Sequence, residues 1–254
     1  MNEILVNQVY QCDNLYLLKE LPSKCIDLIY GDVLFGTGKD FKEFKDLKPV
    51  RLDILEFYTP RLIEMHRVLK PTGLLYFHCD SIISHWIRIL IDGIFGDHNF
   101  RNEIIWYYNS APRKKKDFGK RHDTILRYTK TENYYFNPDS KYVRQPYSET
   151  APRGYDKEKY YDQRGKILDD VWTISILGQN DKTERTGYPT QKPKSLLYPI
   201  IDSSCPSDGV FFDPFVGSGT SVVVAKELNI DFIGCDINHN AISYTIERLK
   251  NVNC

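Results

Sequence analysis

The chain has 254 residues, enough for one sizeable hydrophobic core with a small appendage. Hydrophobic residues make up 41% and charged residues 27%, as in ordinary globular proteins, and no stretch approaches the roughly 18 uninterrupted apolar residues of a membrane span. Residues 1–8 contain neither a basic leader nor an apolar signal segment, so we expect a cytoplasmic protein with no membrane association.

Basic and acidic residues are balanced, at 34 each, which argues against a protein held to nucleic acid by its overall charge. The distribution is uneven, because residues 113–121 contain six cations and one acid. A solvated surface loop is the simpler interpretation of such a run. The alternative is a local phosphate-binding cluster, whose candidate DNA-binding residues are Arg113, Lys114, Lys115, Lys116, Lys120 and Arg121.

The six cysteines are scattered, with no CxxC pair and no histidines at zinc spacing. We interpret them as buried or free thiols, and we expect neither a metal site nor a disulfide framework. His78 and His122 are interpreted as hydrogen-bonding residues at strand ends rather than as metal ligands.

The first half of the chain alternates short apolar strands with amphipathic helices, which predicts a mostly parallel sheet covered by helices. The strands are expected at residues 26–30 and 74–77, the first of them ending just before Asp32. Apolar residues at helical spacing predict helices over residues 54–69 and 81–94.

Regular periodicity fades in the middle of the chain and returns near its end. Two further strands, at residues 104–108 and 124–128, flank the basic run, and residues 134–186 then show no regular pattern. A long irregular insert in a compact enzyme is more often functional than idle. The later elements are a helix at 194–203, a strand at 210–212, a helix at 219–228, a strand at 231–234 and a helix ending near 250.

A glycine-rich turn follows the strand at 210–212, in the order Asp213, Pro214, Phe215, Val216, Gly217, Ser218, Gly219, Thr220. Glycines at a strand-to-helix junction let the backbone approach a ligand where a Cβ atom would clash. The next strand ends at Asp236, and a carboxylate there suits the two hydroxyls of a ribose. The dinucleotide pattern GxGxxG is absent, so a purely structural turn is the alternative to a nucleoside-cofactor site.

These residues resemble a known family. The turn over residues 213–220 is similar to the cofactor motif of DNA methyltransferases that methylate amino groups, and residues 187–193 resemble the PTQKP segment of their permuted, beta-type members. Further likenesses lie at 67–73, 102–106 and 122–126, so the resemblance covers nearly the whole chain apart from much of 134–186.

The resemblance implies an α/β fold: a Rossmann-like class I methyltransferase sheet with helices on both faces and a permuted motif order. Residues 1–254 would form one domain, with a catalytic half at 1–133, a target-recognition lobe at 134–186 and a cofactor half at 187–254. S-adenosylmethionine would be the cofactor and double-stranded DNA the substrate, in a protein of bacterial or phage type. A cognate restriction endonuclease and a homodimer are open alternatives as partners. The cofactor-binding residues implied are Asp32, Thr190, Gln191, Lys192, Asp213, Pro214, Phe215, Gly217, Ser218, Gly219, Thr220 and Asp236. Asp13, just after the first strand, is a further candidate, for contact with the cofactor adenine, and an ordinary turn acid is the alternative.

The catalytic motif departs from the family. The family has Asp-Pro-Pro followed by Tyr or Phe, whereas this chain has Asp32, Val33, Leu34 and Phe35, without either proline. The motif must hold a base extruded from the helix and accept hydrogen bonds from its amino group. By the resemblance, Asp32 supplies a carboxylate, Val33 a carbonyl oxygen and Phe35 a stacking face, while the missing prolines contributed rigidity.

The function predicted is site-specific methylation of adenine at N6, by direct transfer with no covalent intermediate. Methylation of cytosine at N4 is an alternative, although that branch resembles Ser-Pro-Pro-Tyr where this chain has Asp32. A second alternative is a DNA-binding protein that has lost catalysis, as the missing prolines could indicate. Methylation of RNA or protein has no support beyond the shared cofactor fold.

Overall fold

An eight-stranded sheet forms the centre of the computed structural model, which describes residues 5–41, 45–108, 116–147, 162–178, 181 and 183–252. The strands lie in the order β1-β10-β9-β2-β3-β5-β4-β8. Their bounds are β1 Gln8–Gln11, β2 Ile26–Asp32, β3 Leu69–Cys79, β4 Phe100–Tyr107, β5 His122–Thr129, β8 Val171–Thr173, β9 Val210–Asp213 and β10 Asp231–Asp236. Neighbours pair in parallel except where β5 meets β3 and β4, which confirms the mostly parallel sheet.

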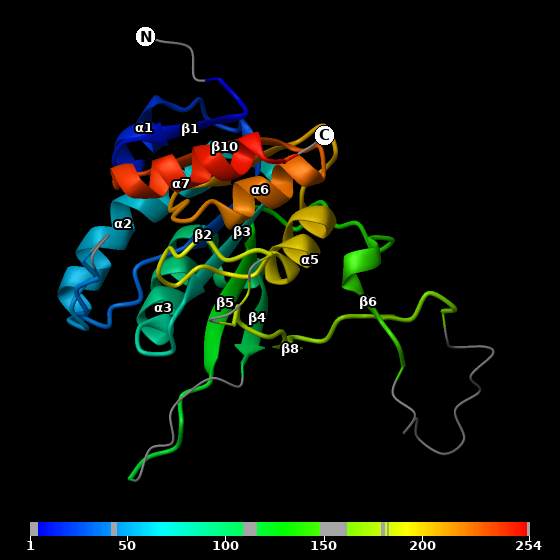
Figure 1. Cartoon of the computed structure of the whole chain (residues 1–254), viewed down its shortest axis with the longest axis horizontal. Helices are drawn as coiled ribbons and strands as arrows, with labels where there is room; N and C mark the ends of the chain where they lie inside the picture. The colour runs from blue at the N-terminus through cyan, green and yellow to red at the C-terminus, as the bar shows by residue number, and fades with distance from the viewer. Residues whose placement is uncertain are drawn as a thin grey trace.

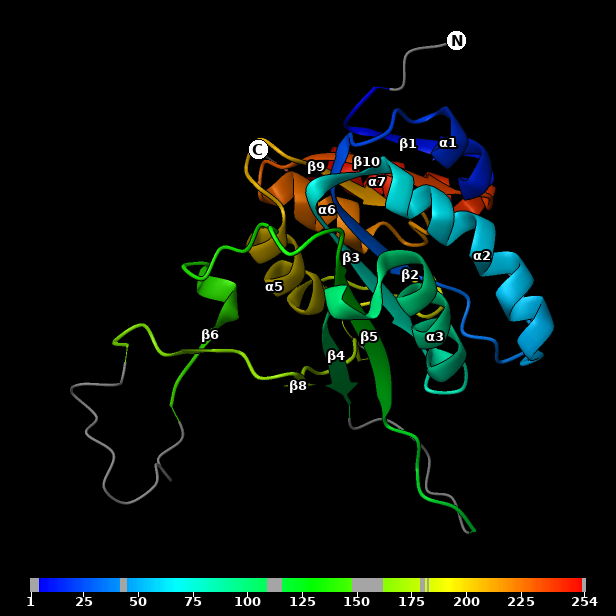
Figure 2. The same cartoon turned by 180° about the vertical axis from the view of Figure 1, so that it is seen from behind.

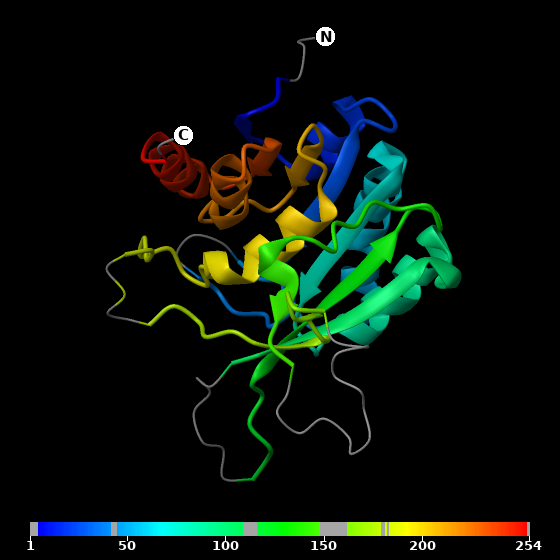
Figure 3. The same ribbon diagram turned by 90° about the vertical axis from the view of Figure 1, so that its right-hand side faces the viewer.

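Helices cover both faces of this sheet. Figure 2 shows α1 (Asn14–Glu20), α2 (Arg51–Val68) and α3 (Ser84–Phe95) in front of one face. Figure 1 shows the opposite face, covered by α5 (Lys194–Ser204), α6 (Thr220–Glu227) and α7 (His239–Lys250). Figure 3 shows the two helical layers from the side. The predicted layered α/β fold is confirmed.

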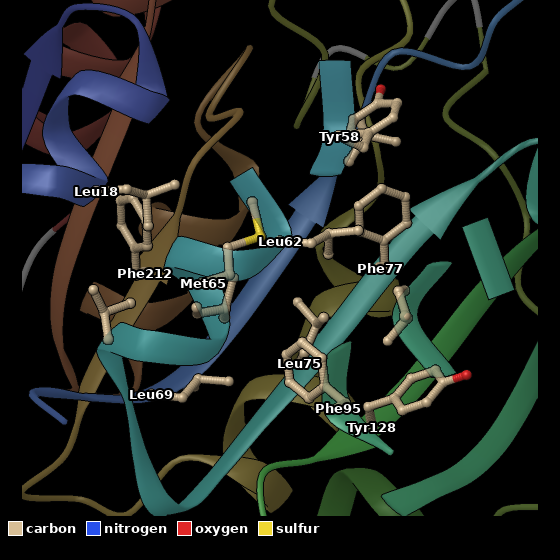
Figure 4. Close-up of a cluster of buried hydrophobic side chains, with 14 of the residues drawn as sticks. Leu18, Tyr58, Leu62, Met65, Leu69, Leu75, Phe77, Phe95, Tyr128 and Phe212 are labelled. Atoms are coloured by element: carbon tan, nitrogen blue, oxygen red, sulfur yellow. The ribbon is translucent and has the colours of Figure 1, made fainter. Parts of the chain in front are cut away.

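The central strand β2 is buried on both faces, which explains its unbroken apolar run. Ile26 and Ile29 pack into the cluster beneath α1, α2 and α3, whereas Leu28 and Tyr30 pack into the cluster beneath α5 and α6. Figure 4 shows the first cluster, in which Tyr58 of α2 lies beside Phe77 of β3. Side chains that alternate between two cores hold β2 in one register.

Several predicted boundaries were wrong: β3 begins at Leu69 rather than at residue 74, and β4 begins at Phe100 rather than at residue 104. The helix predicted at 54–69 begins at Arg51, because its first three residues are exposed and lie outside the buried face that begins at Ile54. It ends at Val68 rather than at Leu69, whose backbone is extended and pairs with Ile26 of β2. Propensity alone could not show this, since the pairing joins residues far apart in the chain.

Part of the stretch at 134–186 joins the main sheet. Strand β8 pairs in parallel with β4, and Trp172 is buried there. The rest of this stretch contains the short elements η2 (Lys141–Val143), β6 (Arg144–Gln145) and β7 (Lys166–Ile167). β6 and β7 pair with each other outside the main sheet. The sequence did not predict that this insert adds an edge strand.

Within the described ranges, no helix is both long enough and apolar enough to cross a membrane. The five described cysteines are free thiols: Cys12, Cys25, Cys79, Cys205 and Cys235. Among the residues that the structure describes, no three or more His, Cys, Asp or Glu side chains lie close enough together to hold a metal ion.

Candidate active site

The site lies at the carboxyl ends of β2 and β9, which are neighbours in the sheet. The helix after β2 covers one face of the sheet and the helix after β9 covers the other, so the winding reverses between these two strands. Ligands of open α/β sheets bind in the crevice outside such a switch point. A cavity of about 860 Å³ opens there, and its lining includes Asp32 at the end of β2 and Asp213 at the end of β9.

Asp213, at the end of β9, anchors the glycine turn through hydrogen bonds to its carboxylate. Its carboxylate is buried and accepts hydrogen bonds from the Phe215 amide, at 2.8 Å, and from the Ser221 hydroxyl. Burial raises the pKa of Asp213 to about 7, and the nearby carboxylates of Asp32 and Asp236 act in the same direction. Asp213 therefore shapes the turn through neutral donors rather than through an ion pair.

The two glycines of the turn have different roles. Gly219 has φ +79°, and a Cβ atom there would lie 2.5 Å from Thr245 Oγ1, so this glycine allows α7 to pack closely. Gly219 is absent from the cavity wall, although the resemblance named it as a cofactor residue. Gly217 has φ +50°, lines the cavity, and donates its amide to Asp236 Oδ2 at 3.0 Å.

Asp236 closes the wall of the cavity at the end of β10. Its carboxylate accepts hydrogen bonds from the amides of Gly217 and Asn238, and burial raises its pKa. The next residue, Ile237, also lines the cavity and is 70% exposed. Sequence reasoning missed Ile237, although its position directly after the acid at a strand end was a usable signal.

The segment over 190–192 forms another part of the wall. Thr190 has φ +59°, and the side-chain oxygen of Gln191 accepts hydrogen bonds from the Thr186 amide and hydroxyl, so Gln191 holds the local shape. The Lys192 carbonyl accepts a hydrogen bond from Thr220 Oγ1 at 3.0 Å, which ties the segment to the glycine turn. Lys192 Nζ lies 2.8 Å from both carboxylate oxygens of Asp32.

Asp13 lies in the cavity wall with two partners of its own. Its carboxylate caps α1 by accepting from the Leu15 amide at 2.7 Å, and it pairs with Arg61 at 2.9 Å. The side chain remains 46% exposed. Its cap and its ion pair are a sufficient structural reason for an acid here.

Asp32, Val33 and Phe35 all line the cavity. Val33 is buried and donates its amide to the carbonyl of His78 at 3.2 Å. The Phe35 ring centroid lies 5.6 Å from the His78 ring, and Lys192 Nζ lies 4.7 Å from the Phe35 ring. The three residues named for the catalytic motif are thus brought together.

A buried polar network stands behind Asp32, centred on His78. His78 Nδ1 lies 2.8 Å from the Tyr30 hydroxyl, and Nε2 lies 3.1 Å from Asp123 Oδ2. The Tyr108 hydroxyl donates to the other oxygen of Asp123 at 2.8 Å. Burial acts to raise the pKa of Asp123, but the interactions with His78, Lys192 and Tyr108 together outweigh it, so this pKa is lowered. The sequence analysis assigned no site role to Tyr30 or Asp123, although Asp123 lies within the family likeness at 122–126.

The last residue of the basic run, Arg121, contacts the rim of this cavity. Tyr108, which lines the cavity, donates its amide to the Arg121 carbonyl, and the segment leading into β5 extends beyond the sheet (Figures 1 and 2). Lys116 and Lys120 are exposed, and Arg121 is partly buried. The other predicted DNA-binding residues, Arg113, Lys114 and Lys115, lie outside the described residues.

The sheet order, the glycine turn and the carboxylates at the ends of β9 and β10 define a protein of the Rossmann-like methyltransferase class. Solved structures with this fold include the cytosine-N4-specific PvuII DNA methyltransferase, with a TM-score of 0.71 and 16% identity over 97% of this chain and 88% of that chain. Another is the complex of M1.HpyAVI with SAM, with a TM-score of 0.63 and 19% identity over 96% and 99% of the two chains.

Residues 26–247 match the model of the N6/N4 DNA methylase family. The chain is 35% identical to the type II methyltransferase M.HpaI of Haemophilus parainfluenzae over 94% of this chain and 73% of that protein. It is 29% identical to the DNA adenine methyltransferase YhdJ of Escherichia coli (strain K12), over 93% of this chain and 80% of that protein. The chain therefore belongs to the N6/N4 family of DNA methylases. It is a DNA amino-methyltransferase, and its cofactor is S-adenosylmethionine.

Proposed function

We propose that this enzyme methylates the exocyclic N6 of adenine in double-stranded DNA. The observation that carries the proposal is the Asp32 carboxylate, which lies in the cavity at the carboxyl end of β2 with Phe35 nearby. In the cytosine-specific branch that the sequence resembles, this position is serine. The likeness to YhdJ, described as a DNA adenine methyltransferase, supports the same assignment.

The cavity suits S-adenosylmethionine on three counts. Gly217 presents a left-handed backbone without a side chain, and the nearest atom to a Cβ there would be Tyr188 Cε1 at 3.6 Å. The Asp236 carboxylate suits ribose hydroxyls, because each of its oxygens can accept a further hydrogen bond beyond the two backbone amides it holds. Ile237 offers an exposed apolar side chain on which an adenine ring can stack.

We propose a cofactor site built from these residues, from the segments at 190–192 and 213–220, and from Asp13 and Asp32. Gly219 contributes by shaping the turn. The full set is Asp13, Asp32, Thr190, Gln191, Lys192, Asp213, Pro214, Phe215, Gly217, Ser218, Gly219, Thr220, Asp236 and Ile237.

The catalytic residues act by holding the target amino group. The Asp32 carboxylate and the Val33 carbonyl accept hydrogen bonds from its two N–H groups, and these bonds orient the nitrogen lone pair. The Phe35 ring stacks on the base. An ionised carboxylate has about four acceptor sites, so the pair with Lys192 leaves room for a base amino group. When bound, the cofactor supplies an electrophilic methyl group, and these residues provide the positioning that direct transfer needs.

DNA contacts are assigned to the basic run and to the lobe at 134–186. The run ends at Arg121 beside the cavity rim, so its cations can neutralise phosphates beside an extruded base. We propose phosphate contacts for Arg113, Lys114, Lys115, Lys116, Lys120 and Arg121, and target recognition for the lobe. A basic run beside the pocket gives the enzyme a local site for phosphates despite its zero net charge.

Incubation with labelled S-adenosylmethionine and unmethylated genomic DNA, followed by mass spectrometry of the nucleosides, tests the proposal. The expected product is N6-methyladenine, with Asp236→Ala as a control of reduced cofactor affinity. Formation of N4-methylcytosine would show that the target is cytosine rather than adenine. If the parent protein binds the cofactor but modifies neither base, the proposal of catalysis is wrong.

A further inference from the structure

The catalytic loop, residues 32–38, lacks the two prolines of its family. We propose that Asp46 and Tyr58 are positioning residues that keep this loop rigid and so replace the prolines. The proposal rests on the catalytic roles proposed above for Asp32 and Phe35. The evidence is a set of hydrogen bonds that attach the loop to residues outside it.

Asp46 clamps the far end of the loop. One carboxylate oxygen accepts from the Gly36 amide at 3.0 Å, and the other accepts from the Thr37 amide at 2.7 Å and from the Thr37 hydroxyl. Asp46 is only 4% exposed, and in the described part of the chain no cation pairs with it. Three neutral donors on an otherwise unpaired buried carboxylate form strong hydrogen bonds, because bonds to an ion are stronger than bonds between neutral groups.

The clamp is itself fixed by the backbone. The Asp46 amide donates to the Lys39 carbonyl at 2.9 Å, and the Gly38 amide donates to the Leu47 carbonyl at 2.8 Å. The two segments are therefore paired on both sides of the carboxylate. This pairing places the Asp46 side chain against the loop rather than in solvent.

Tyr58 holds the middle of the loop from α2. Its hydroxyl donates to the Leu34 carbonyl at 2.8 Å, and its ring is fully buried against Phe77, with ring centroids 5.3 Å apart (Figure 4). A ring packed in the main core can move little, so it transmits the rigidity of that core to the Leu34 backbone. Phe35 lies between the Leu34 and Gly36 anchors, and its position follows from both.

The backbone hydrogen bonds of Val33 and Leu34 show how holding the loop by side chains differs from holding it by prolines. The Val33 amide donates to the His78 carbonyl, a hydrogen bond that a proline at this position cannot make. Among the described residues, the Val33 carbonyl accepts no hydrogen bond, so it remains available for a base amino group. Leu34 has no partner for its amide in the same residues, so a proline would remove no hydrogen bond there.

The test compares Asp46→Asn and Tyr58→Phe with Asp27→Asn. Asp27 is a control for the loss of a buried carboxylate: it is 5% exposed, accepts from the Val210 amide and pairs with Lys70 at 2.7 Å, and it lies away from the catalytic loop. We expect Asp46→Asn to lower kcat by at least about tenfold, since misplaced catalytic groups reduce rates by up to about 100-fold. The KM for S-adenosylmethionine should change less than about twofold. Tyr58→Phe should lower kcat by a smaller factor, again with little change in KM. Asp27→Asn should keep the parent kcat.

Amide hydrogen exchange provides a readout that does not depend on activity. The amides of Gly36 and Thr37 should be protected in the parent and in Asp27→Asn, and should exchange at least about tenfold faster in Asp46→Asn. If the parent transfers no methyl group but shows this pattern, the proposed reaction fails and the clamp stands. Equal exchange in Asp46→Asn and Asp27→Asn would overturn the clamp, whatever the activity.

A proline added to the loop tests whether the two solutions are equivalent. Leu34→Pro in the Asp46→Asn background should restore part of the missing kcat, because proline fixes its own φ near −65°. The two substitutions should therefore be non-additive in a double-mutant cycle. A double variant no faster than Asp46→Asn would overturn the equivalence of clamp and proline.

Discussion

The glycine turn over 213–219 and the catalytic loop over 32–38 both line one cavity, but they differ in how much of the family's motif each retains. Each segment contains two glycines of positive φ, Gly217 and Gly219 in the turn and Gly36 and Gly38 in the loop. The turn resembles the family motif throughout and is also held by the Asp236 carboxylate. The loop lacks the two prolines, and hydrogen bonds from Asp46, Tyr58 and the His78 carbonyl attach it to the rest of the protein. Contacts from outside allow a segment to lose part of its motif and keep its geometry.

The largest effect is expected at the catalytic loop itself. Asp32→Ala should lower kcat by at least about 100-fold, the loss typical when a group that stabilises the transition state is removed. Cofactor affinity, measured by calorimetry, should change little. Asp32→Asn is the matched control, because it keeps one acceptor oxygen and should retain more activity than alanine. Equal rates for parent and Asp32→Ala would show that the loop carries no chemistry.

The buried Asp213 carboxyl of the glycine turn should make the free energy of unfolding depend on pH. The pKa of Asp213 is raised from 3.8 to about 7, so the folded state retains a proton that the unfolded state releases. The free energy of unfolding therefore decreases as pH rises from about 4 to about 7, by roughly 4 kcal/mol from this group. Asp213→Asn should flatten this decrease, as measured by urea unfolding across the window. Parallel pH profiles for parent and variant would contradict the burial argument.

Much of the turn was predictable from sequence, and the reason is local. A glycine that adopts positive φ, and an acid at the next strand end, are marks that a single segment carries. By contrast, Asp46, Tyr58 and Asp123 contact the site from distant segments, and each looks like an ordinary buried or surface residue in sequence. Their roles exist only through tertiary contacts.

The same division explains the fold. The strands at 26–30 and 210–212 were predictable because they are buried on both faces and read as apolar runs. Strand β8 was not, because only Trp172 of its three residues is buried and its pairing with β4 is non-local. The mistaken end of α2 has the same origin, since Leu69 belongs to β3 through its pairing with Ile26.

A smaller effect is expected from the acid at the end of β10. Asp236→Ala should weaken S-adenosylmethionine binding by about 1.5–3 kcal/mol, the range for hydrogen bonds to a charged group. The variant also loses the acceptor for the Gly217 amide, so circular dichroism should accompany the calorimetry. An unchanged affinity in a folded variant would remove Asp236 from the cofactor site.

The smallest effect is expected outside both segments, on the basic run. Replacing the exposed Lys116 and Lys120 with alanine should lower the salt dependence of DNA affinity, by about one slope unit for every lysine that neutralises a phosphate. Lys19 and Lys250, which are exposed on α1 and α7, provide a control pair of equal charge. If both double variants keep the parent slope, the run is a solvated loop.

The central claim is that a catalytic loop without prolines is competent because distant side chains hold it. The single-turnover rate of methyl transfer, with enzyme in excess over DNA and saturating S-adenosylmethionine, tests it most directly. The account predicts rapid formation of N6-methyladenine by the parent and by Asp27→Asn, and a rate at least about tenfold lower for Asp46→Asn. Equal rates in all three proteins, or no transfer by the parent, would contradict it.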